Sequence, residues 1–255
     1  MNMPTDAPIT DDKPVVAVTG ASRGIGHAIV KDFYSAGWEV LTLARTPFSQ
    51  VCPWAEGIVK HIEADLTQEA SIMAACGTLR DRLGDKGLSA LVNNAGISPK
   101  DDGGARLSAM KTSFETWNAV QMVNLMGPLM LCQQLIGPLS QARGAVVNVT
   151  SIAGTQIHPF AGAAYAVSKA GLSALTRELA FELADSGVRV NAVSPGEIET
   201  SILSPGTDEL VERLVPMKRL GSPKEVAEVV TFLCSQKSSY INGAEIPING
   251  GQHLL

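Results

Sequence analysis

The chain has 255 residues and a mass of 26.8 kDa, and hydrophobic residues make up 45% of it. A chain of this size and composition can bury a full core, so we exclude a disordered polymer. The net charge of −5 disfavours nucleic-acid and anionic-membrane partners, because both bind basic surfaces. The aromatic content of only 5% disfavours an aromatic platform for stacking nucleic-acid bases.

The four cysteines are widely separated, and none has a histidine at metal-ligand spacing, so we expect free thiols, a cytoplasmic protein and no metal site. The most apolar stretch, residues 122–139, contains an asparagine, two glutamines and two prolines. We therefore expect no membrane helix, which would need about 18 apolar residues in a row. Residues 1–12 have no apolar core, and we interpret them as a flexible tail and not a signal peptide.

Short apolar runs alternate with helical patterns along the rest of the chain. The runs predict strands at 14–20, 39–44, 58–62, 89–93, 144–150, 188–193 and 245–248. Helical spacing of apolar residues predicts helices over 25–37, 68–83, 114–139 and 163–184, and another from Ser222 onward. This alternation predicts one α/β domain over residues 13–255, with a doubly wound, seven-stranded parallel sheet.

Three glycines lie between the first predicted strand and the first helix, in the sequence Thr19-Gly-Ala-Ser-Arg-Gly-Ile-Gly26. Glycines at such a turn let the backbone approach a pyrophosphate, and the helix N-terminus supplies unpaired N–H groups. The spacing differs from G-x-G-x-x-G, and alone it fits an ordinary strand-to-helix turn equally well. Its position after a buried strand favours nucleotide binding.

Seven blocks resemble, in order, those of the short-chain dehydrogenase/reductase family. They are Thr19 to Gly26, Asp65-Leu-Thr67, Asn93-Asn-Ala-Gly96, Asn124, Ser151, Tyr165-Ala-Val-Ser-Lys169 and Ser194-Pro-Gly196. The resemblance extends from about Pro14 to the C-terminus. It implies a Rossmann-type fold, a nicotinamide cofactor, oxidoreductase activity on a small-molecule carbonyl compound or alcohol, and a homotetramer or homodimer.

The resemblance also implies which residues bind the cofactor. They are Gly20, Ser22, Arg23, Gly24, Ile25, Gly26, Arg45, Asp65, Leu66, Asn93, Ala95, Gly96, Tyr165, Lys169, Pro195, Gly196, Ile198 and Thr200. Asp65 would accept a hydrogen bond from the adenine amine. Because Asp65 precedes a predicted helix, it is also a plausible helix N-cap.

The end of the second predicted strand bears on the choice between NAD(H) and NADP(H). Ala44 stands where similar NAD enzymes carry an aspartate for the ribose 2′-hydroxyl, and Arg45 follows it. The guanidiniums of Arg45 and Arg23 are either ligands for a 2′-phosphate or solvated surface charges. We expect NADP(H) to be preferred, with NAD(H) as the alternative.

Tyr165 and Lys169 lie four residues apart in a predicted helix and so share one face, although such a pair alone is more typical of surface packing. A nearby ammonium would lower the phenol pKa from its usual value of about 10, which suits a general acid and base. In the family, Ser151 binds the substrate oxygen, and Asn124 disturbs its helix and holds a water that bridges to Lys169. The alternatives are a turn serine and a buried amide bound to backbone.

Loops beyond the strand ends should select the substrate. The candidate pocket residues are Ile97, Ile152, His158, Phe160 and Ile202. Most are apolar, which favours a hydrophobic or moderately sized carbonyl compound, and His158 is either a polar contact or incidental. We expect Glu197 to face solvent and residues 99–106 to form a mobile surface flap at the edge of the pocket.

Residues 216–225 resemble the corresponding part of 3-oxoacyl-carrier-protein reductases, but Phe181 stands where such reductases often carry a basic residue that docks the acidic carrier. The substrate therefore stays open. The alternative enzyme is an NAD-linked alcohol or polyol dehydrogenase, and the alternative outside enzymes is a nucleotide-binding sensor. The complete group of Asn124, Ser151, Tyr165 and Lys169 favours a catalyst.

Overall fold

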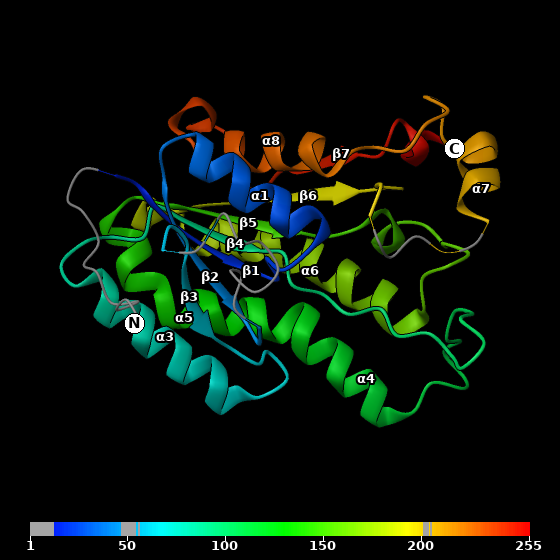
Figure 1. The fold of residues 1–255 in the computed structure, drawn as a ribbon, viewed down its shortest axis with the longest axis horizontal. Coiled ribbons are helices and arrows are strands. Elements are labelled where there is room, and N and C mark those ends of the chain that lie inside the picture. The colour runs from blue at the N-terminus through cyan, green and yellow to red at the C-terminus, as the bar shows by residue number, and fades with distance from the viewer. Residues whose placement is uncertain (1–12, 47–54, 56, 201–203, 205) are drawn as a thin grey trace.

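A computed structural model describes residues 13–46, 55, 57–200, 204 and 206–255 (Figure 1). The expectation of an N-terminal tail, and the positions of Cys52 and Ile202, lie outside these residues. The described residues form one parallel sheet with the strand order β3-β2-β1-β4-β5-β6-β7. The strands are β1 (Val15–Thr19), β2 (Glu39–Ala44), β3 (Lys60–Glu63), β4 (Ala90–Asn93), β5 (Ala145–Val149), β6 (Arg189–Pro195) and β7 (Glu245–Ile248). The predicted seven-stranded parallel sheet is confirmed.

Helices cover both faces of the sheet. They are α1 (Gly24–Ser35), α3 (Glu69–Leu83), α4 (Phe114–Gln121), α5 (Gly127–Gln141), α6 (Ala163–Glu182), α7 (Thr207–Leu214) and α8 (Pro223–Cys234). Helices α1 and α8 contact each other on one face, while α3 to α6 lie on the other, as Figure 1 shows. The sheet is therefore the middle of three layers, and its carboxyl edge is left to loops.

The central strand β1 is buried on both sides, which explains its unbroken apolar run. Val16 and Val18 belong to the core beneath α1 and α8, whereas Val15 and Ala17 belong to the core beneath α3 and α5. All four side chains are fully buried. Successive residues of a strand face opposite sides, so a strand between two helical layers needs apolar residues at every position.

The long apolar helix predicted over 114–139 is interrupted in the structure. A π-helical turn, Met122–Met126, separates α4 from α5. Within the described residues, the combined segment Phe114–Gln141 meets the length and composition of a membrane-spanning helix, with a mean hydropathy of 1.2 over an 18-residue window, although polar residues and prolines interrupt it. The packing identifies a core helix, because Leu131, Leu135 and Leu139 are fully buried within the fold.

Helix α7 was not among the predicted elements. Its N-cap is Gly206, which has a positive φ of 86°, and the helix buries Leu210 and Val211. Six of its eight residues are polar, charged or partly exposed, so its apolar pattern is too short to detect in the sequence. Helix α8 starts where predicted, since Ser222 and Glu225 form a reciprocal capping box.

Candidate active site

The glycine loop after β1 can only be built from glycines at three positions. Gly20 and Gly24 have φ angles of +66° and +54°, a region that other residues rarely adopt. A Cβ atom on Gly26 would lie 2.2 Å from the Gly20 carbonyl oxygen. The first N–H groups of α1, which have no partner within the helix, point out of this narrow turn. The loop therefore fits the diphosphate of a dinucleotide.

Asn94 fastens this loop and is a residue that the sequence analysis missed. Its Nδ2 atom donates to the carbonyls of Thr19 at 3.0 Å and Gly20 at 2.9 Å. The Thr19 hydroxyl in turn accepts from the backbone N–H groups of Asn94 and Ala95, both at 3.0 Å. The second asparagine of Asn93-Asn94-Ala-Gly96 was the available signal for this role.

The side chain of Asn93 points elsewhere. Its Nδ2 atom donates to Asn148 Oδ1 at 2.9 Å, and the residue is only 2% exposed. The amide therefore joins β4 to β5 in the core. Any contact of Asn93 with a cofactor is left to its backbone.

Asp65 and Arg45 lie near each other, beyond the carboxyl ends of β3 and β2. Asp65 Oδ1 accepts from the Thr67 backbone N–H at 2.9 Å and from the Thr67 hydroxyl at 2.8 Å. These bonds lower the pKa of Asp65, and the Arg45 guanidinium adds a smaller effect in the same direction. The N-cap of α3 is Gln68, so the helix-cap interpretation of Asp65 is wrong and the residue forms a turn instead. Arg45 is exposed, as is Arg23, which is the N-cap residue of α1.

The loop after β6 returns to the glycine loop. A Cβ atom on Gly24 would lie 3.2 Å from Thr200 Cγ2, so these two predicted cofactor residues are neighbours. Ile198 is held by a parallel bridge to Gly221 and is 5% exposed. A Cβ atom on Gly196 would lie 2.6 Å from Asn249 Cβ, which explains the glycine there. The other predicted cofactor residues lie on the same edge of the sheet: Ser22, Ile25, Leu66, Ala95, Gly96 and Pro195.

Lys169 enters the site from α6 with almost no exposure to solvent. It is 3% exposed, and its Nζ atom donates to the Val149 carbonyl at 2.6 Å. The same atom lies 5.7 Å from the centroid of the Tyr165 ring. Burial disfavours the charged form and lowers the pKa of Lys169 from 10.5 to about 8. A buried amine that titrates near neutral pH is more typical of a functional site than of surface packing.

The pKa of Tyr165 is raised and not lowered. Burial is the main cause, a hydrogen bond with Ser151 lowers the pKa, and the negative charge of Glu197 raises it further. The expectation that a neighbouring ammonium would lower the pKa is therefore wrong for this structure, because burial of the phenol outweighs the other effects. Tyr165 holds its proton at neutral pH.

Asn124 lies in the π-helical turn and confirms that this residue disturbs its helix. The amide is fully buried, and its Nδ2 atom donates to Ile97 O at 3.0 Å and to Ser168 Oγ at 2.9 Å. Its Oδ1 atom accepts from Ile97 N at 2.9 Å. A Cβ atom on Gly96 would lie 3.4 Å from Lys169 Nζ and 3.6 Å from Asn124 Oδ1. The glycine thus leaves the space between these two side chains open.

The Glu197 side chain is largely withdrawn from solvent, so the expectation that it faces solvent is wrong. Its Oε1 atom lies 2.5 Å from Nε2 of His158, and the two side chains are 9% and 13% exposed. His158 is therefore a structured part of the site. Of the other predicted pocket residues, Ile152 is 3% exposed beside Ser151, and Ile97 binds Asn124 through its backbone.

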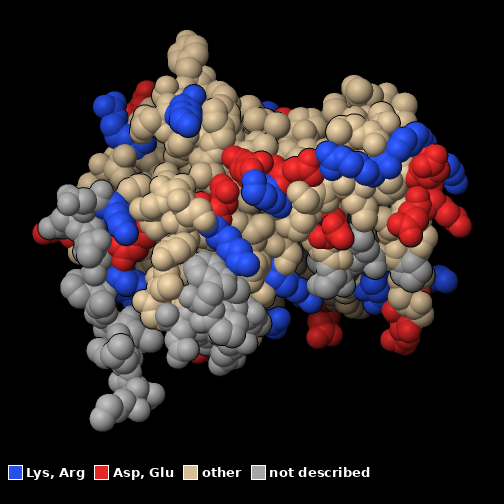
Figure 2. Space-filling model, turned by 45° about the horizontal axis from the view of Figure 1, so that its top comes forward, with Lys and Arg blue, Asp and Glu red and all other residues tan. Residues whose placement is uncertain are grey.

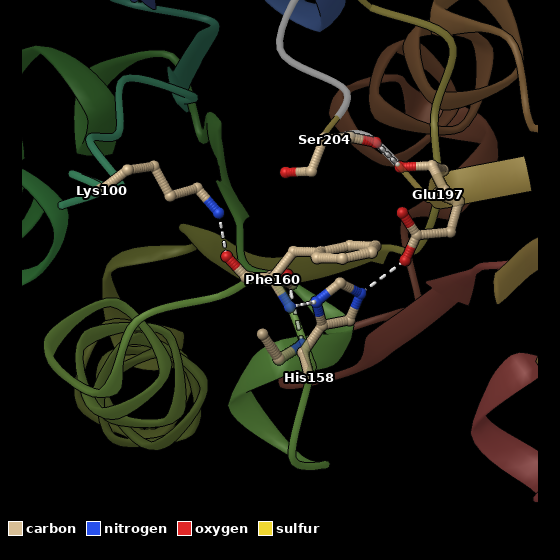
Figure 3. A network of polar contacts seen from close by, with 8 residues as sticks. Lys100, His158, Phe160, Glu197 and Ser204 are labelled. Atoms are coloured by element: carbon tan, nitrogen blue, oxygen red, sulfur yellow. Dashed lines mark hydrogen bonds and ion pairs between the residues drawn. The ribbon is translucent and has the colours of Figure 1, made fainter. Parts of the chain in front are cut away.

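Residues 99–106 form a tethered turn where the sequence analysis predicted a mobile flap. Lys100 and Arg106 are paired in an antiparallel bridge. Between them, Asp101 Oδ1 accepts from Gly103 N at 3.0 Å and from Ala105 N at 2.7 Å. The Lys100 ammonium donates to the Phe160 carbonyl, so the turn borders the predicted pocket (Figure 3). Across the described ranges we find no group of three His, Cys, Asp or Glu side chains suited to a metal.

A glycine loop at the carboxyl edge of a doubly wound sheet, with a buried lysine near a tyrosine at the same edge, defines an oxidoreductase of the dinucleotide-binding class. Residues 20–253 match the family described as Enoyl-(Acyl carrier protein) reductase. The chain belongs to the short-chain dehydrogenase/reductase family, which confirms the resemblance seen in the sequence.

Three similar proteins are Protein FixR, a 3-oxoacyl-[acyl-carrier-protein] reductase and a solved short-chain dehydrogenase/reductase. The chain is 51% identical to Protein FixR of Bradyrhizobium diazoefficiens over 94% of its own length and 87% of that protein. It is 38% identical to the 3-oxoacyl-[acyl-carrier-protein] reductase FabG of Aquifex aeolicus over 93% and 96%. A short-chain dehydrogenase/reductase from Brucella ovis, solved with partially ordered NAD, has 49% identity and a TM-score of 0.81 and covers 93% of this chain and 100% of its own.

Proposed function

We propose that the chain catalyses reversible hydride transfer between a nicotinamide cofactor and a small carbonyl compound or secondary alcohol, with Tyr165 as the proton donor and acceptor. The observation that carries this proposal is the convergence of Ser151, Tyr165 and Lys169. Ser151 is hydrogen-bonded to Tyr165, and Lys169 Nζ lies 5.7 Å from the phenol ring. A sensor would have no need of this group.

The glycine loop fits the diphosphate, and Thr200, Ile198 and Gly196 would enclose the nicotinamide end. When bound, the cofactor would supply or accept the hydride, and the protein would position it. The family resemblance assigns the adenine to the neighbourhood of Asp65. Its Oδ1 atom is already used by Thr67, which leaves the other carboxylate oxygen as the acceptor for an adenine amine.

The proton is held at the Tyr165 hydroxyl. Because the pKa of Tyr165 is raised, chiefly by burial, the phenol is protonated at neutral pH and is ready to donate to a carbonyl oxygen. Ser151 favours the phenolate that this donation leaves. Lys169, with a pKa of about 8, is well matched to return a proton to the Tyr165 phenolate. The space beside Gly96 lies between Lys169 and Asn124, and we propose that a water bridges these two side chains there.

We infer a preference for NADP(H) from the adenosine corner. Ala44 carries no carboxylate that would repel a 2′-phosphate, and Arg45 lies close enough to Asp65 to affect its pKa. Arg23 is exposed at the start of α1. The Brucella ovis relative was solved with NAD and a relative from Beutenbergia cavernae with NADP, so both cofactors occur among similar proteins.

The expected homotetramer or homodimer is supported by an exposed apolar face on two helices that contact each other. On α4 and α6, Phe114, Val167 and Phe181 are 87%, 54% and 84% exposed. Exposed Phe181 is also unsuited to docking an acidic carrier protein. On the face seen in Figure 2, the described basic side chains are interspersed with acidic ones, which does not favour a nucleic-acid or anionic-membrane partner. We retain the cytoplasm as the proposed location.

The test is a panel of ketones, aldehydes and secondary alcohols assayed with NADPH, NADP+, NADH and NAD+. The proposal predicts turnover that consumes cofactor and carbonyl compound in equal amounts, faster with the phosphorylated cofactor. Better kcat/KM with NADH would overturn the cofactor preference and favour the NAD-linked dehydrogenase. Tight cofactor binding without turnover on any compound would favour the sensor.

A further inference from the structure

The hydrogen bonds around His158 assign the donor and acceptor roles of its two ring nitrogens. The Phe160 backbone N–H donates to His158 Nδ1 at 3.2 Å, so Nδ1 must be the unprotonated nitrogen. The ring proton then lies on Nε2, which donates to Glu197 Oε1 at 2.5 Å. These two bonds assign Nδ1 of His158 as the acceptor and Nε2 as the donor to Glu197.

Nearby cations are occupied by other partners. Lys169 Nζ donates to the Val149 carbonyl, and Lys100 Nζ donates to the Phe160 carbonyl. Arg219 binds both carboxylate oxygens of Glu225, at 2.7 and 3.0 Å. Among the described residues, His158 is the one recorded hydrogen-bond partner of the Glu197 carboxylate, and it binds Oε1. The second oxygen, Oε2, has none within that part of the chain.

The carboxylate lies between Tyr165 and open space. Burial is the main cause of the raised pKa of Tyr165, but the Glu197 charge adds to it, so the charge lies within electrostatic reach of the phenol. On another side, Glu197 lines a cavity of about 300 Å³ together with Val215, Met217 and Arg219. Glu197 therefore borders open space, and the described lining of that cavity includes neither Tyr165 nor His158.

Three chain segments meet around Phe160 and His158, and His158 holds the Glu197 carboxylate. Figure 3 shows Lys100 reaching Phe160 from one side, while Glu197 faces His158 from the other. The Phe160 and His158 rings meet edge to face at 5.9 Å between centroids. A Cβ atom on Gly206 would lie 3.5 Å from Phe160 Cζ, so the same phenylalanine also borders the start of α7. The polar group is thus built into a largely apolar border, as is usual for groups that orient a ligand.

We propose that Glu197, oriented by its hydrogen bond with His158, determines substrate specificity: it selects carbonyl compounds that carry a hydroxyl or ammonium group next to the reacting carbon and rejects those with a carboxylate there. A buried carboxylate accepts hydrogen bonds strongly, attracts a cation and repels an anion. This inference rests on the proposed function. It adds a polar recognition group to a pocket that the sequence analysis described as apolar.

Four ketones of similar size test the inference with NADPH as cofactor: 2-butanone, hydroxyacetone, aminoacetone and pyruvate. For the wild-type protein we expect kcat/KM values for hydroxyacetone and aminoacetone at least about tenfold above that for butanone, and a value for pyruvate at least about tenfold below it. A tenfold ratio corresponds to about 1.4 kcal/mol. Glu197→Gln keeps an oxygen that accepts from His158 Nε2 and removes only the charge.

In Glu197→Gln we expect the kcat/KM advantage of aminoacetone over butanone and the penalty of pyruvate relative to butanone each to shrink at least about tenfold. Equal effects on all four ketones, or unchanged ratios, would show a merely structural pair and overturn the inference. Glu199→Gln, an exposed neighbour, is the matched control and should leave the ratios unchanged.

Calorimetric binding of the matching alcohols to the NADP+ complex separates this inference from the proposed function. The alcohols are 2-butanol, 1,2-propanediol, 1-amino-2-propanol and lactate. If no ketone turns over but charge-dependent binding is lost in Glu197→Gln, the proposed function fails and the recognition site stands. If turnover occurs but binding and rates show no preference by charge, the recognition site fails alone.

Discussion

Lys169 Nζ lies 5.7 Å from the centroid of the Tyr165 ring and donates its hydrogen bond to the Val149 carbonyl at the end of β5. The lysine is thus fixed by the sheet, not by the tyrosine. Its burial has a cost in stability that a protein accepts where function requires it.

Lys169→Met should stabilise the fold and abolish turnover. The folded pKa of about 8 lies below the ordinary value of 10.5, so keeping the ammonium buried costs about 3 kcal/mol at pH 7. After subtracting the lost bond to Val149, we expect the free energy of unfolding to rise by about 1–3 kcal/mol. Between pH 8 and about 10.5 the unfolded wild type binds more protons than the folded wild type. Over that range the free energy of unfolding of the wild type therefore rises relative to that of the variant.

Urea unfolding between pH 6 and 10 measures this effect, with exposed Lys111→Met as the control that should change little. A variant less stable than the wild type at pH 7 would contradict the account. So would an advantage that grows as the pH rises.

Ser151→Ala should slow catalysis and move its pH dependence. Ser151 lowers the pKa of Tyr165 through its hydrogen bond, so its loss should raise that pKa above its already high value. We expect kcat to fall about 10²-fold and the rise of alcohol oxidation with pH to shift toward alkaline pH. Exposed Ser186→Ala is the control. An unshifted pH profile would refute the role of this bond.

Gly26→Ala should close the glycine loop, whereas Gly77→Ala should not. A Cβ atom on Gly26 would lie 2.2 Å from Gly20 O and 2.4 Å from Asn94 Nδ2, but one on Gly77 meets nothing within 4 Å. We expect Gly26→Ala to weaken cofactor binding at least about tenfold and to destabilise the fold by about 1–3 kcal/mol. Gly77→Ala in α3 should add about 0.5–1 kcal/mol of stability. Thermal unfolding and fluorescence titration with NADPH compare the two, and equal effects would be inconsistent with a tight loop.

Arg45→Ala should lower kcat/KM for NADPH about 10-fold to 100-fold and leave that for NADH within about twofold, because a charge-assisted bond to the 2′-phosphate is lost. The control is Lys237→Ala, which also removes one exposed positive charge. Lys237 lies near the amino end of β6, because its neighbour Ser238 binds Arg189, the first residue of that strand. Equal losses with both cofactors would argue against a phosphate contact.

The sheet could be predicted because its strands carry their own signal. In β1 successive residues such as Val15 and Val16 face two different cores, so every position must be apolar. A strand with one face exposed to solvent needs an apolar residue only at every second position. Helix α7 was not predicted, because it buries only a few residues and its apolar pattern is short. The family resemblance implied that Asn124 disturbs its helix, whereas the apolar pattern predicted an unbroken helix, and only the structure shows the π turn.

The site was predictable at the level of residue types but not of electrostatics. The spacing of Tyr165 and Lys169 placed both on one helix face, yet the direction of the Tyr165 pKa depends on burial, which spacing does not reveal. Glu197 and His158 are 39 positions apart, and no local pattern joins them. Asn94 was passed over because its neighbour Asn93 has the same side chain and only tertiary packing distinguishes their directions.

The most direct test of the central claim is the turnover of Tyr165→Phe with NADPH and a ketone reduced by the wild type, together with its dissociation constant for NADPH. The account predicts a fall in kcat of about 10²–10⁴-fold and a dissociation constant within about threefold of the wild type, because the phenol exchanges the proton but does not build the glycine loop. A variant that retains near wild-type kcat would contradict it.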